Sequence, residues 1–485
     1  MDLTTIPWSR IDPGNALARD YLVAPESVLP LFARDYRDPR ALRAFAAAQR
    51  TSPREPLAPL LLPYNREVGG SAENAARIDE ALCVVAGQQV GLLFGPAYTT
   101  WKLFTTIRAA KVLSEELATP VVPVFWVESE DHDWDEVNRF HWGERRFRIE
   151  AEMPAGTPLS LAEADPGPFL ALVREAIGRD GEAWDLVAPE RRIARWHVRN
   201  LARLVAGEGV VFVEPALLRE PMRALARRIA ADPSPLDASL SRDTGRARSL
   251  APPDGAYFFR AGPPRTRLDR GEPLPVEWSS DVASRVLVQN AAFRALAAVC
   301  GPSEIAYWSQ LREAHEAYGI PMPAVLPRNA ATLVESGIAR DAARVGLDVE
   351  EVVRGDATAA PPAAEDPVAL RLRRLAGEAA SLTAALDDGT LSLPPNTENP
   401  FRRTVERLGG DLARLAARLD DAREEARGAG RRREERVLRE LRPRGGPQER
   451  SHGILPYLLR HGPGLAKRLR DSFDPWEFGH YLVFL

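Results

Sequence analysis

The sequence is poor in cysteine, and this shortage excludes two classes of structure. Only two cysteines occur among 485 residues, Cys83 and Cys300, too few for a disulfide framework or a cysteine-ligated zinc site. We therefore expect a reducing compartment, and the absence of a secretory signal at the N-terminus predicts a cytoplasmic protein. Cys83 lies within an apolar run, which favours a small inert hydrophobic residue over a nucleophile.

Long apolar runs and a strong net charge are also absent. No run approaches the ~20 apolar residues that a membrane-spanning helix requires, so we expect no membrane partner. The net charge of −4 argues against nucleic acid or an anionic membrane as the main partner. The chain is long enough for two or three domains, and 45% hydrophobic residues is ordinary for a globular protein.

Lysine is the scarcest of the charged residues. Only Lys102, Lys111 and Lys467 occur, so nearly all of the 64 basic residues are arginine. The bias is better explained by the coding genome than by function. Against this background, a retained lysine is a candidate for a position that needs an amine. Lys102 lies one helical turn after Tyr98 and Thr99, which makes it a candidate catalytic residue.

The most informative stretch covers residues 82–137. An apolar run at 82–86 leads into GQQVGLLFGPAYT, a helical pattern follows over 98–117, and a second apolar run at 120–127 stops at ESEDHD. Continuous apolar strands around a helix predict a parallel βαβ unit that is covered on both faces. Because ligands bind at the carboxyl ends of such strands, we expect the two polar clusters to lie side by side.

The remainder predicts an α/β core with a helical arm. Strand and helix patterns alternate over residues 80–335, which indicates one open α/β sheet. After an Ala/Pro-rich linker, two segments carry apolar residues spaced four and three apart, as in an antiparallel coiled coil. The seam positions include Val368, Ala379, Leu382, Leu386, Val405, Leu408 and Leu415. We predict a core with N-terminal helices and inserted subdomains at 1–360, a coiled coil at 361–446, and a tail at 447–485 that packs back on the core.

The glycine-rich turn after the first strand is the first candidate site. Glycines at a strand-to-helix turn let backbone N–H groups approach an anion at the helix N-terminus. The spacing matches neither the dinucleotide motif nor the phosphate loop, so a purely structural turn is at least as well supported. The candidate binding residues of this segment are Gln88, Gln89, Gly91, Gly95, Tyr98 and Thr99.

The acidic cluster after the second strand is the second candidate. Glu130, Asp131, His132 and Asp133 directly follow a buried strand, which is unfavourable unless they face solvent or a ligand. They could bind Mg²⁺, accept hydrogen bonds from an amine or a sugar, or act as acid and base. The alternative is an exposed acidic helix start, but the facing glycine-rich turn favours function. A zinc site is disfavoured because no second histidine lies at ligand spacing.

A third group lies between residues 304 and 328. Its members are Glu304, Tyr307, Trp308, Gln310 and Arg328. The aromatic residues could simply fill the core, whereas Arg328 follows a strand end and could bind a carboxylate or a phosphate through two parallel hydrogen bonds. The arginine run at 431–444 is interspersed with glutamates and is best interpreted as a solvated helix face.

Four blocks of sequence resemble one known family. They read GQQVGLLFGPAYTTWK, PVVPVFWVESEDHDWDEVN, GPSEIAYWSQLREAHEAYGIPMPAVLPR and QERSHGILPYLLRHGP, and they resemble BshC, the cysteine ligase family of bacillithiol biosynthesis, in the family's order over nearly the whole chain. The resemblance implies that cysteine is joined to glucosaminyl-malate through an amide bond to the sugar amine. It also implies a Rossmann-like core similar to the nucleotidyltransferase fold of class I aminoacyl-tRNA synthetases, and a coiled coil used in homodimerisation.

The resemblance also implies positions for the site. GPAYTTWK would stand where the synthetases carry their first signature, with SEDHD over the same pocket, and ATP with Mg²⁺ would activate the cysteine carboxylate. The lysine-rich second signature of the synthetases is absent, so Lys102 or arginines would have to replace it. WSSDVASRVLVQN departs from the family's Ser-Pro-Asn opening, which makes Arg285 and Gln289 better candidates than Asp281. A second nucleotide site near the base of the coiled coil would involve Tyr457, Arg460 and Trp476.

These observations favour a dimeric cysteine:amine ligase. Residues 87–102 would hold a nucleotide or an acyl phosphate, while Asp131, His132 and Asp133 would hold the amine or act as base. The alternative is a non-catalytic nucleotide-binding scaffold whose coiled coil recruits other proteins. The acidic cluster and Lys102 favour the enzyme, whereas the missing lysine signature favours the scaffold. A synthetase that acts on tRNA is disfavoured because no large basic surface is evident.

Overall fold

A computed structural model describes the chain except for residues 53, 243–255, 358–365 and 478. The chain divides into two compact units, one made of residues 1–334 and 443–485 and the other of residues 335–442. Within the described parts, no helix combines the length and the apolar character that crossing a membrane requires.

A five-stranded parallel sheet forms the centre of the first unit. Its strand order places β2 in the middle, with β3 and β6 on one side and β10 and β11 on the other. The bounds are β11 (Ala324–Pro327), β10 (Ala295–Cys300), β2 (Leu82–Gln89), β3 (Val121–Glu128) and β6 (Val211–Val213). The predicted α/β fold with a Rossmann-like parallel sheet is confirmed.

The β2–α5–β3 unit explains why this sheet forms. The side chains of both strands are buried along almost their whole length, as their continuous apolar character requires. Helix α5 (Ala97–Leu117) begins after Pro96 and buries Trp101 and Phe104 completely as it packs on β2, β3 and β10. The strand order reverses between β2 and β10, which is the position where open α/β sheets bind their ligands.

Helices and small sheets surround the central sheet. The N-terminal elements are β1 (Asp2–Pro7), α1 (Ala16–Val23), α2 (Pro39–Thr51), α3 (Ala58–Val68) and α4 (Ala72–Ala76). Between β3 and β10 lie α6 (Trp134–Val137), β4 (Arg139–Trp142), β5 (Arg145–Arg148), α7 (Pro166–Ile177), α8 (Ile193–Leu204), α9 (Arg223–Ala231), α10 (Ser234–Ser241), β7 (Phe258–Arg260), β8 (Thr266–Arg267), β9 (Trp278–Ser280) and α11 (Val282–Ala292). Helices α12 (Pro302–Trp308) and α13 (Arg312–Tyr318) connect β10 to β11.

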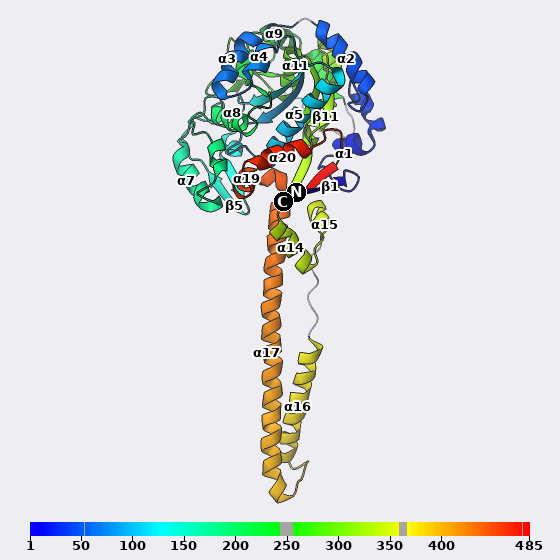
Figure 1. Cartoon of the computed structure of the whole chain (residues 1–485), viewed down its shortest axis with the longest axis vertical. Coiled ribbons are helices and arrows are strands. Elements are labelled where there is room, and N and C mark those ends of the chain that lie inside the picture. The colour runs from blue at the N-terminus through cyan, green and yellow to red at the C-terminus, as the bar shows by residue number, and fades with distance from the viewer. Residues whose placement is uncertain (53, 243–255, 358–365, 478) are drawn as a thin grey trace. The chain divides into compact units, whose positions relative to one another are not determined.

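The C-terminal tail belongs to the same unit as the central sheet. Its elements are α18 (Gln448–Ser451), α19 (Leu455–His461), α20 (Gly464–Ser472) and β13 (Gly479–Phe484). Strand β13 pairs antiparallel with β1 and parallel with β12 (Ala330–Val334), so the two ends of the chain lie side by side (Figure 1). The ring of Phe473 packs edge-on against Trp101 of α5, at 5.5 Å between centroids.

The second unit is helical and contains the predicted antiparallel arm. It consists of α14 (Ser336–Val345), α15 (Val349–Arg354), α16 (Pro367–Asp387) and α17 (Pro395–Leu441). Helices α16 and α17 run side by side (Figure 1), and ion pairs of Arg373 with Asp420 and of Arg402 with Asp387 define their antiparallel register.

The seam between α16 and α17 differs from the predicted one. Ala379, Leu386 and Val405 are buried as expected, whereas Val368, Leu382, Leu408 and Leu415 are exposed. The two helices approach closely through small residues, since a Cβ on Gly409 would lie only 3.2 Å from the Cβ of Ala379. When two helices pack together, each covers one apolar stripe on the other. The apolar residues of α16 and α17 extend beyond that stripe, so some of them stay exposed.

Candidate functional site

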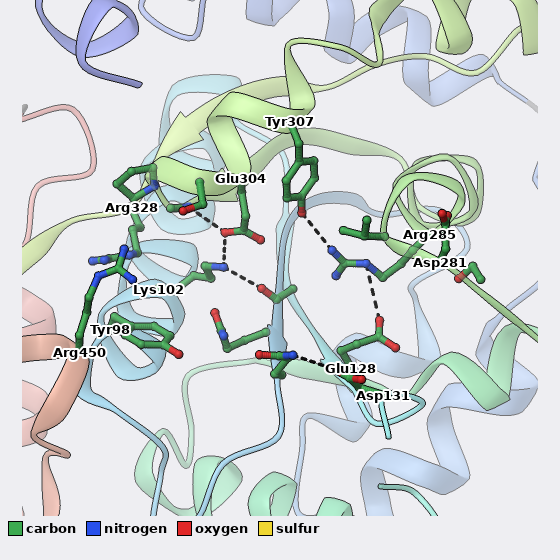
Figure 2. Close-up of a pocket in the computed structure, with 18 of the residues that line it drawn as sticks. Tyr98, Lys102, Glu128, Asp131, Asp281, Arg285, Glu304, Tyr307, Arg328 and Arg450 are labelled. Carbon is green, nitrogen blue, oxygen red and sulfur yellow. Dashed lines mark hydrogen bonds and ion pairs between the residues drawn. The ribbon is translucent and has the colours of Figure 1, made fainter. Parts of the chain in front are cut away.

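A cavity of about 620 Å³ opens over the carboxyl ends of four strands of the parallel sheet. Gly87 of β2 and Glu128 of β3 line it together with Gly301 and Arg328, which directly follow β10 and β11. Figure 2 shows that side chains from all these elements converge on the same space. The cavity therefore lies at the point of strand-order reversal, where the fold provides a ligand site.

Lys102 is held at the floor of this cavity by two groups. Its Nζ donates to the carbonyl oxygen of Gly87 at 2.8 Å and forms an ion pair with Glu304. Glu304 in turn accepts from the backbone N–H of Gly301 at 2.8 Å. An ammonium group has three donors, so the third donor of Lys102 remains for the cavity that this residue lines.

Arg285 of α11 forms the opposite wall with Glu128 and Tyr307. Its Nη2 donates to the Tyr307 hydroxyl at 3.0 Å, and its Nε lies 3.6 Å from Oε2 of Glu128. Burial disfavours the charge on Arg285, yet Tyr307 and the nearby carboxylates of Glu128 and Glu304 raise its pKa above the ordinary value. The Arg285 guanidinium is therefore a fixed positive charge in the wall of the cavity.

Arg328 forms a buried bidentate pair with Glu449 of α18. Its Nη1 and Nη2 donate to the two carboxylate oxygens at 3.0 and 2.5 Å, and both side chains are 6% exposed. Oε2 of Glu449 also accepts from the backbone N–H of Ala331, at 3.3 Å. The bidentate carboxylate partner that the sequence suggested for Arg328 is thus a side chain of this chain, and the pair joins the C-terminal tail to the end of β11.

The four consecutive residues of the acidic cluster point in different directions. Only Asp131 lines the cavity, where it accepts from Nε2 of Gln89 at 2.5 Å. Glu130 is buried and pairs with Arg219. The two clusters of the βαβ unit therefore do meet, as expected, through the Gln89–Asp131 contact.

His132 and Asp133 do not line this cavity. The His132 side chain is 41% exposed, and its Nδ1 lies 3.4 Å from Nη1 of Arg265. Asp133 caps helix α6 by accepting from the backbone N–H of Glu136 at 3.3 Å. The alternative interpretation of an acidic helix start thus describes Asp133, while its predicted catalytic role and that of His132 stay predictions.

The other predicted residues fall into three places. Gln88, Gln89 and Tyr98 line the cavity, and the same three residues border a neighbouring cavity of about 350 Å³ that Gly91, Gly95 and Thr99 also line. Gln289, Trp308 and Gln310 are buried but line neither cavity. Gly91 serves the turn itself, since a Cβ there would lie 2.8 Å from the Cα of Gly95.

The residues suggested for a second nucleotide site do not form one cluster. Tyr457 and Arg460 surround Trp142, with the Arg460 guanidinium 4.8 Å from the Trp142 ring centroid. Trp476 instead donates its indole N–H to the carbonyl oxygen of Tyr36, at 3.2 Å. The structure therefore brings Tyr457 and Arg460 together, whereas Trp476 contacts the N-terminal part of the chain at Tyr36.

Sequence reasoning did not select several residues that line the cavity. They are Glu128, Phe259, Arg265, Arg267 and Arg450, while Asp281 was ranked below its neighbours. Arg265 and Arg267 both lie over the Phe259 ring, at 3.7 and 4.5 Å from its centroid. The available signals were that Glu128 stands two residues before the acidic cluster and that Arg450 stands in the QER block.

The burial of Glu130 gives a testable pH dependence. Burial raises the pKa of Glu130 from 4.5 to about 7, although Arg219 opposes the shift. The folded state therefore binds this proton more tightly than the unfolded state, and the resulting stability is lost as the pH rises through 7. Relative to Glu130→Gln, the wild-type protein should lose about 1–3 kcal/mol of unfolding free energy between pH 5 and pH 8. Urea denaturation at both pH values measures this difference, and parallel pH profiles would contradict it.

Together, the parallel sheet and the charged cavity at its strand-order reversal define a Rossmann-like α/β protein with a polar ligand site. The family model of the N-terminal Rossmann-like domain of bacillithiol biosynthesis BshC matches residues 1–176 and 268–329, and the model of the BshC C-terminal coiled-coil domain matches residues 331–485. The chain belongs to the BshC family.

Curated relatives match over almost their whole length. A protein from Symbiobacterium thermophilum is 31% identical, with 100% of both chains covered, and one from Anoxybacillus flavithermus is 28% identical, with 97% of this chain and 98% of the relative covered. Both are named "Putative cysteine ligase BshC". A solved structure described as a putative arginyl tRNA synthetase from Campylobacter jejuni covers 86% of this chain and 91% of its own, but at 11% identity and a TM-score of 0.25 it supports no argument.

Proposed function

We propose that the protein is a ligase that joins the carboxyl group of cysteine to the amine of glucosaminyl-malate. The observation that carries the proposal is a cavity with both signs of charge at the ligand position of the fold, in a chain whose relatives are named cysteine ligases. A carboxylate and an ammonium group can be held next to each other only where the site offers partners for both.

The geometry suggests a division of roles within the cavity. The amine must lose a proton before it attacks, and Asp131 is the carboxylate of the acidic cluster that reaches the cavity, which makes it the proposed base. Glu128 lies beside it and would orient the ammonium form. Lys102 and Arg285 would stabilise the negative charge that develops on the oxygen of the attacked carboxyl group.

ATP is the proposed cosubstrate, because an amide does not form from a free carboxylate without activation. ATP would convert one carboxylate oxygen of cysteine into part of a phosphate leaving group, and the amine would then replace it. The 620 Å³ cavity is of the size that small-ligand sites have. Among the described residues, no three acidic, cysteine or histidine side chains gather in a way that could ligate a metal. Mg²⁺ would therefore be brought by the ATP phosphates rather than by a protein cage.

A direct assay tests this proposal. Purified protein is incubated with cysteine, glucosaminyl-malate, Mg²⁺ and ATP, and the amide, AMP and ADP are measured by mass spectrometry. Amide together with AMP would indicate adenylation, and amide together with ADP would indicate an acyl phosphate. Absence of amide, with ATP still raising the melting temperature, would instead support the non-catalytic scaffold, which the paired charges of the cavity do not favour.

The proposed homodimer gives a separate prediction on the helical arm. Leu408 and Leu415 lie one heptad apart on α17, and their side chains are 54% and 49% exposed, so they form a stripe that a second copy could cover. Replacing both by aspartate should convert a dimer into a monomer, as measured by light scattering coupled to size exclusion. The matched control changes Arg407 and Arg414 to aspartate on the same helix. A wild-type monomer, or a variant that stays dimeric, would contradict the prediction.

A further inference from the structure

The second cavity, of about 350 Å³, adjoins the first one and is not a separate site. Gln88, Gln89, Tyr98 and Arg450 line both cavities, so a single ligand can extend from one into the other past the Tyr98 ring. In Figure 2, Arg450 lies on the side of Tyr98 away from Arg285 and Glu128, and its side chain extends toward Arg328. The two compartments thus form one elongated site with Tyr98 at the junction.

The residues that line each compartment carry an excess of two positive charges, but the two compartments differ in how their cations are paired. In the first cavity, Lys102, Arg285 and Arg328 each have a carboxylate partner. The second cavity is lined by Arg139, Arg444 and Arg450 against one acid, Glu136, which gives an excess of two positive charges. Arg139 donates from Nε to the backbone oxygen of Glu136, at 3.3 Å. Within the described part of the chain, neither Arg444 nor Arg450 forms an ion pair.

The residues that line the second cavity favour the binding of an anion over that of a cation. Burial and the nearby charges of Arg444, Arg139 and Arg146 lower the pKa of His141 to about 4, so this ring stays neutral and acts only as a hydrogen-bonding wall. Arginine side chains bind carboxylate and phosphate groups through paired N–H donors. Two or three unpaired guanidinium groups in 350 Å³ fit a small dianion.

We infer that the second cavity binds the dicarboxylate end of the aminosugar acceptor, while the acceptor amine reaches past Tyr98 into the first cavity. The inference rests on the proposed function, which supplies an acceptor with an amine at one end and a malate group at the other. It makes Arg139, Arg444 and Arg450 specificity-determining residues, because they would distinguish this acceptor from an aminosugar without the acidic group. A phosphate group of ATP is the competing dianion, and the experiment separates the two.

The kinetic test compares two acceptors and matched variants. Arg444→Gln and Arg139→Gln should raise the KM for glucosaminyl-malate about tenfold or more, through loss of a charged contact, with kcat and the KM for cysteine and ATP within about twofold. With methyl glucosaminide, which lacks the dicarboxylate, wild type and variants should be equally slow. Arg145→Gln is the control, since it removes the same charge from the same hairpin at a residue that lines neither cavity. Unchanged KM values for glucosaminyl-malate, or a rise in the KM for ATP alone, would overturn the inference.

A binding test stands apart from catalysis. L-malate alone should raise the melting temperature of the wild-type protein and of Arg145→Gln, but not that of Arg444→Gln. Inorganic phosphate should do so much less well at equal ionic strength. If the wild-type protein makes no amide, the proposed function fails, and malate binding still decides whether the cavity accepts a dicarboxylate. Stabilisation by phosphate but not by malate would assign the cavity to a phosphate group instead.

Discussion

Replacing Arg328 by alanine should lower the free energy of unfolding by about 3–5 kcal/mol, the loss expected when one partner of a buried ion pair is removed. Glu449 would remain buried, and among the described residues it would keep one hydrogen bond, from the Ala331 N–H at 3.3 Å. The measurement is equilibrium denaturation of the purified variant at neutral pH. Arg43→Ala, an exposed arginine on α2, is the matched control and should cost about 0.5 kcal/mol or less.

The pH dependence of this variant distinguishes the ion pair from simple loss of packing. Burial would raise the pKa of Glu449, but the adjacent Arg328 guanidinium holds it below the ordinary value. Such a carboxylate stabilises the fold above its unfolded pKa, and this contribution is lost as the pH falls through the folded pKa. The gap between wild type and Arg328→Ala should therefore narrow in acid. The double variant Arg328→Met, Glu449→Leu should recover most of the stability, and a constant gap at all pH values would refute the ion-pair explanation.

The strands and the helix that carry the site were predictable because each of them lies in one kind of environment along its length, the buried interior of the protein. The apolar run at 82–86 is buried on both faces, as is the run expected at 120–127 from residue 121 onward, and the helix expected over 98–117 is observed as Ala97–Leu117. The spacing of the apolar residues and the composition of these segments therefore indicated the same elements that the tertiary structure contains. The antiparallel arm was predictable for the same reason, although the heptad pattern did not reveal which apolar stripe α16 covers.

The internal strand β10 was not recognisable from the sequence. Its residues read ALAAVC, and alanine favours helix over strand when no context intervenes. The segment is a strand because β2 and β11 pair with it on both sides. That pairing places Gly301 and Glu304 opposite Lys102, an arrangement that depends on contacts about 200 residues apart and leaves no local pattern.

The sequence predicted where the acidic cluster lies better than it predicted which of its side chains point into the cavity. The acidic cluster was correctly placed at the end of β3, but the chain leaves the sheet there and the alternation of a strand no longer applies. Glu128 and Asp131 turn into the cavity while Glu130 is buried and Asp133 caps α6. The arginines on the inserted β7–β8 hairpin reach the cavity only through tertiary packing, so no spacing could have identified them.

Replacing Lys102 by methionine should lower kcat for amide formation about 10²–10³-fold, the effect of removing one charged donor from a developing oxyanion. Methionine is an unbranched side chain one atom shorter than lysine, so it keeps most of the volume, but it leaves Glu304 without its ion pair. Lys111→Met is the matched control, because it removes the same group from the exposed side of the same helix. This control should retain the wild-type rate.

The double variant Lys102→Met, Glu304→Gln separates chemistry from folding. Neutralising Glu304 removes the unpaired carboxylate, while the glutamine can still accept from the Gly301 N–H, so the melting temperature should recover toward wild type. The rate should not recover, because the third donor of Lys102 is still missing from the cavity. Measuring both the melting temperature and the rate of amide formation is therefore decisive. A double variant with a restored rate would mean that Lys102 only balances the charge of Glu304, and Arg285 would then be the group that stabilises the oxyanion.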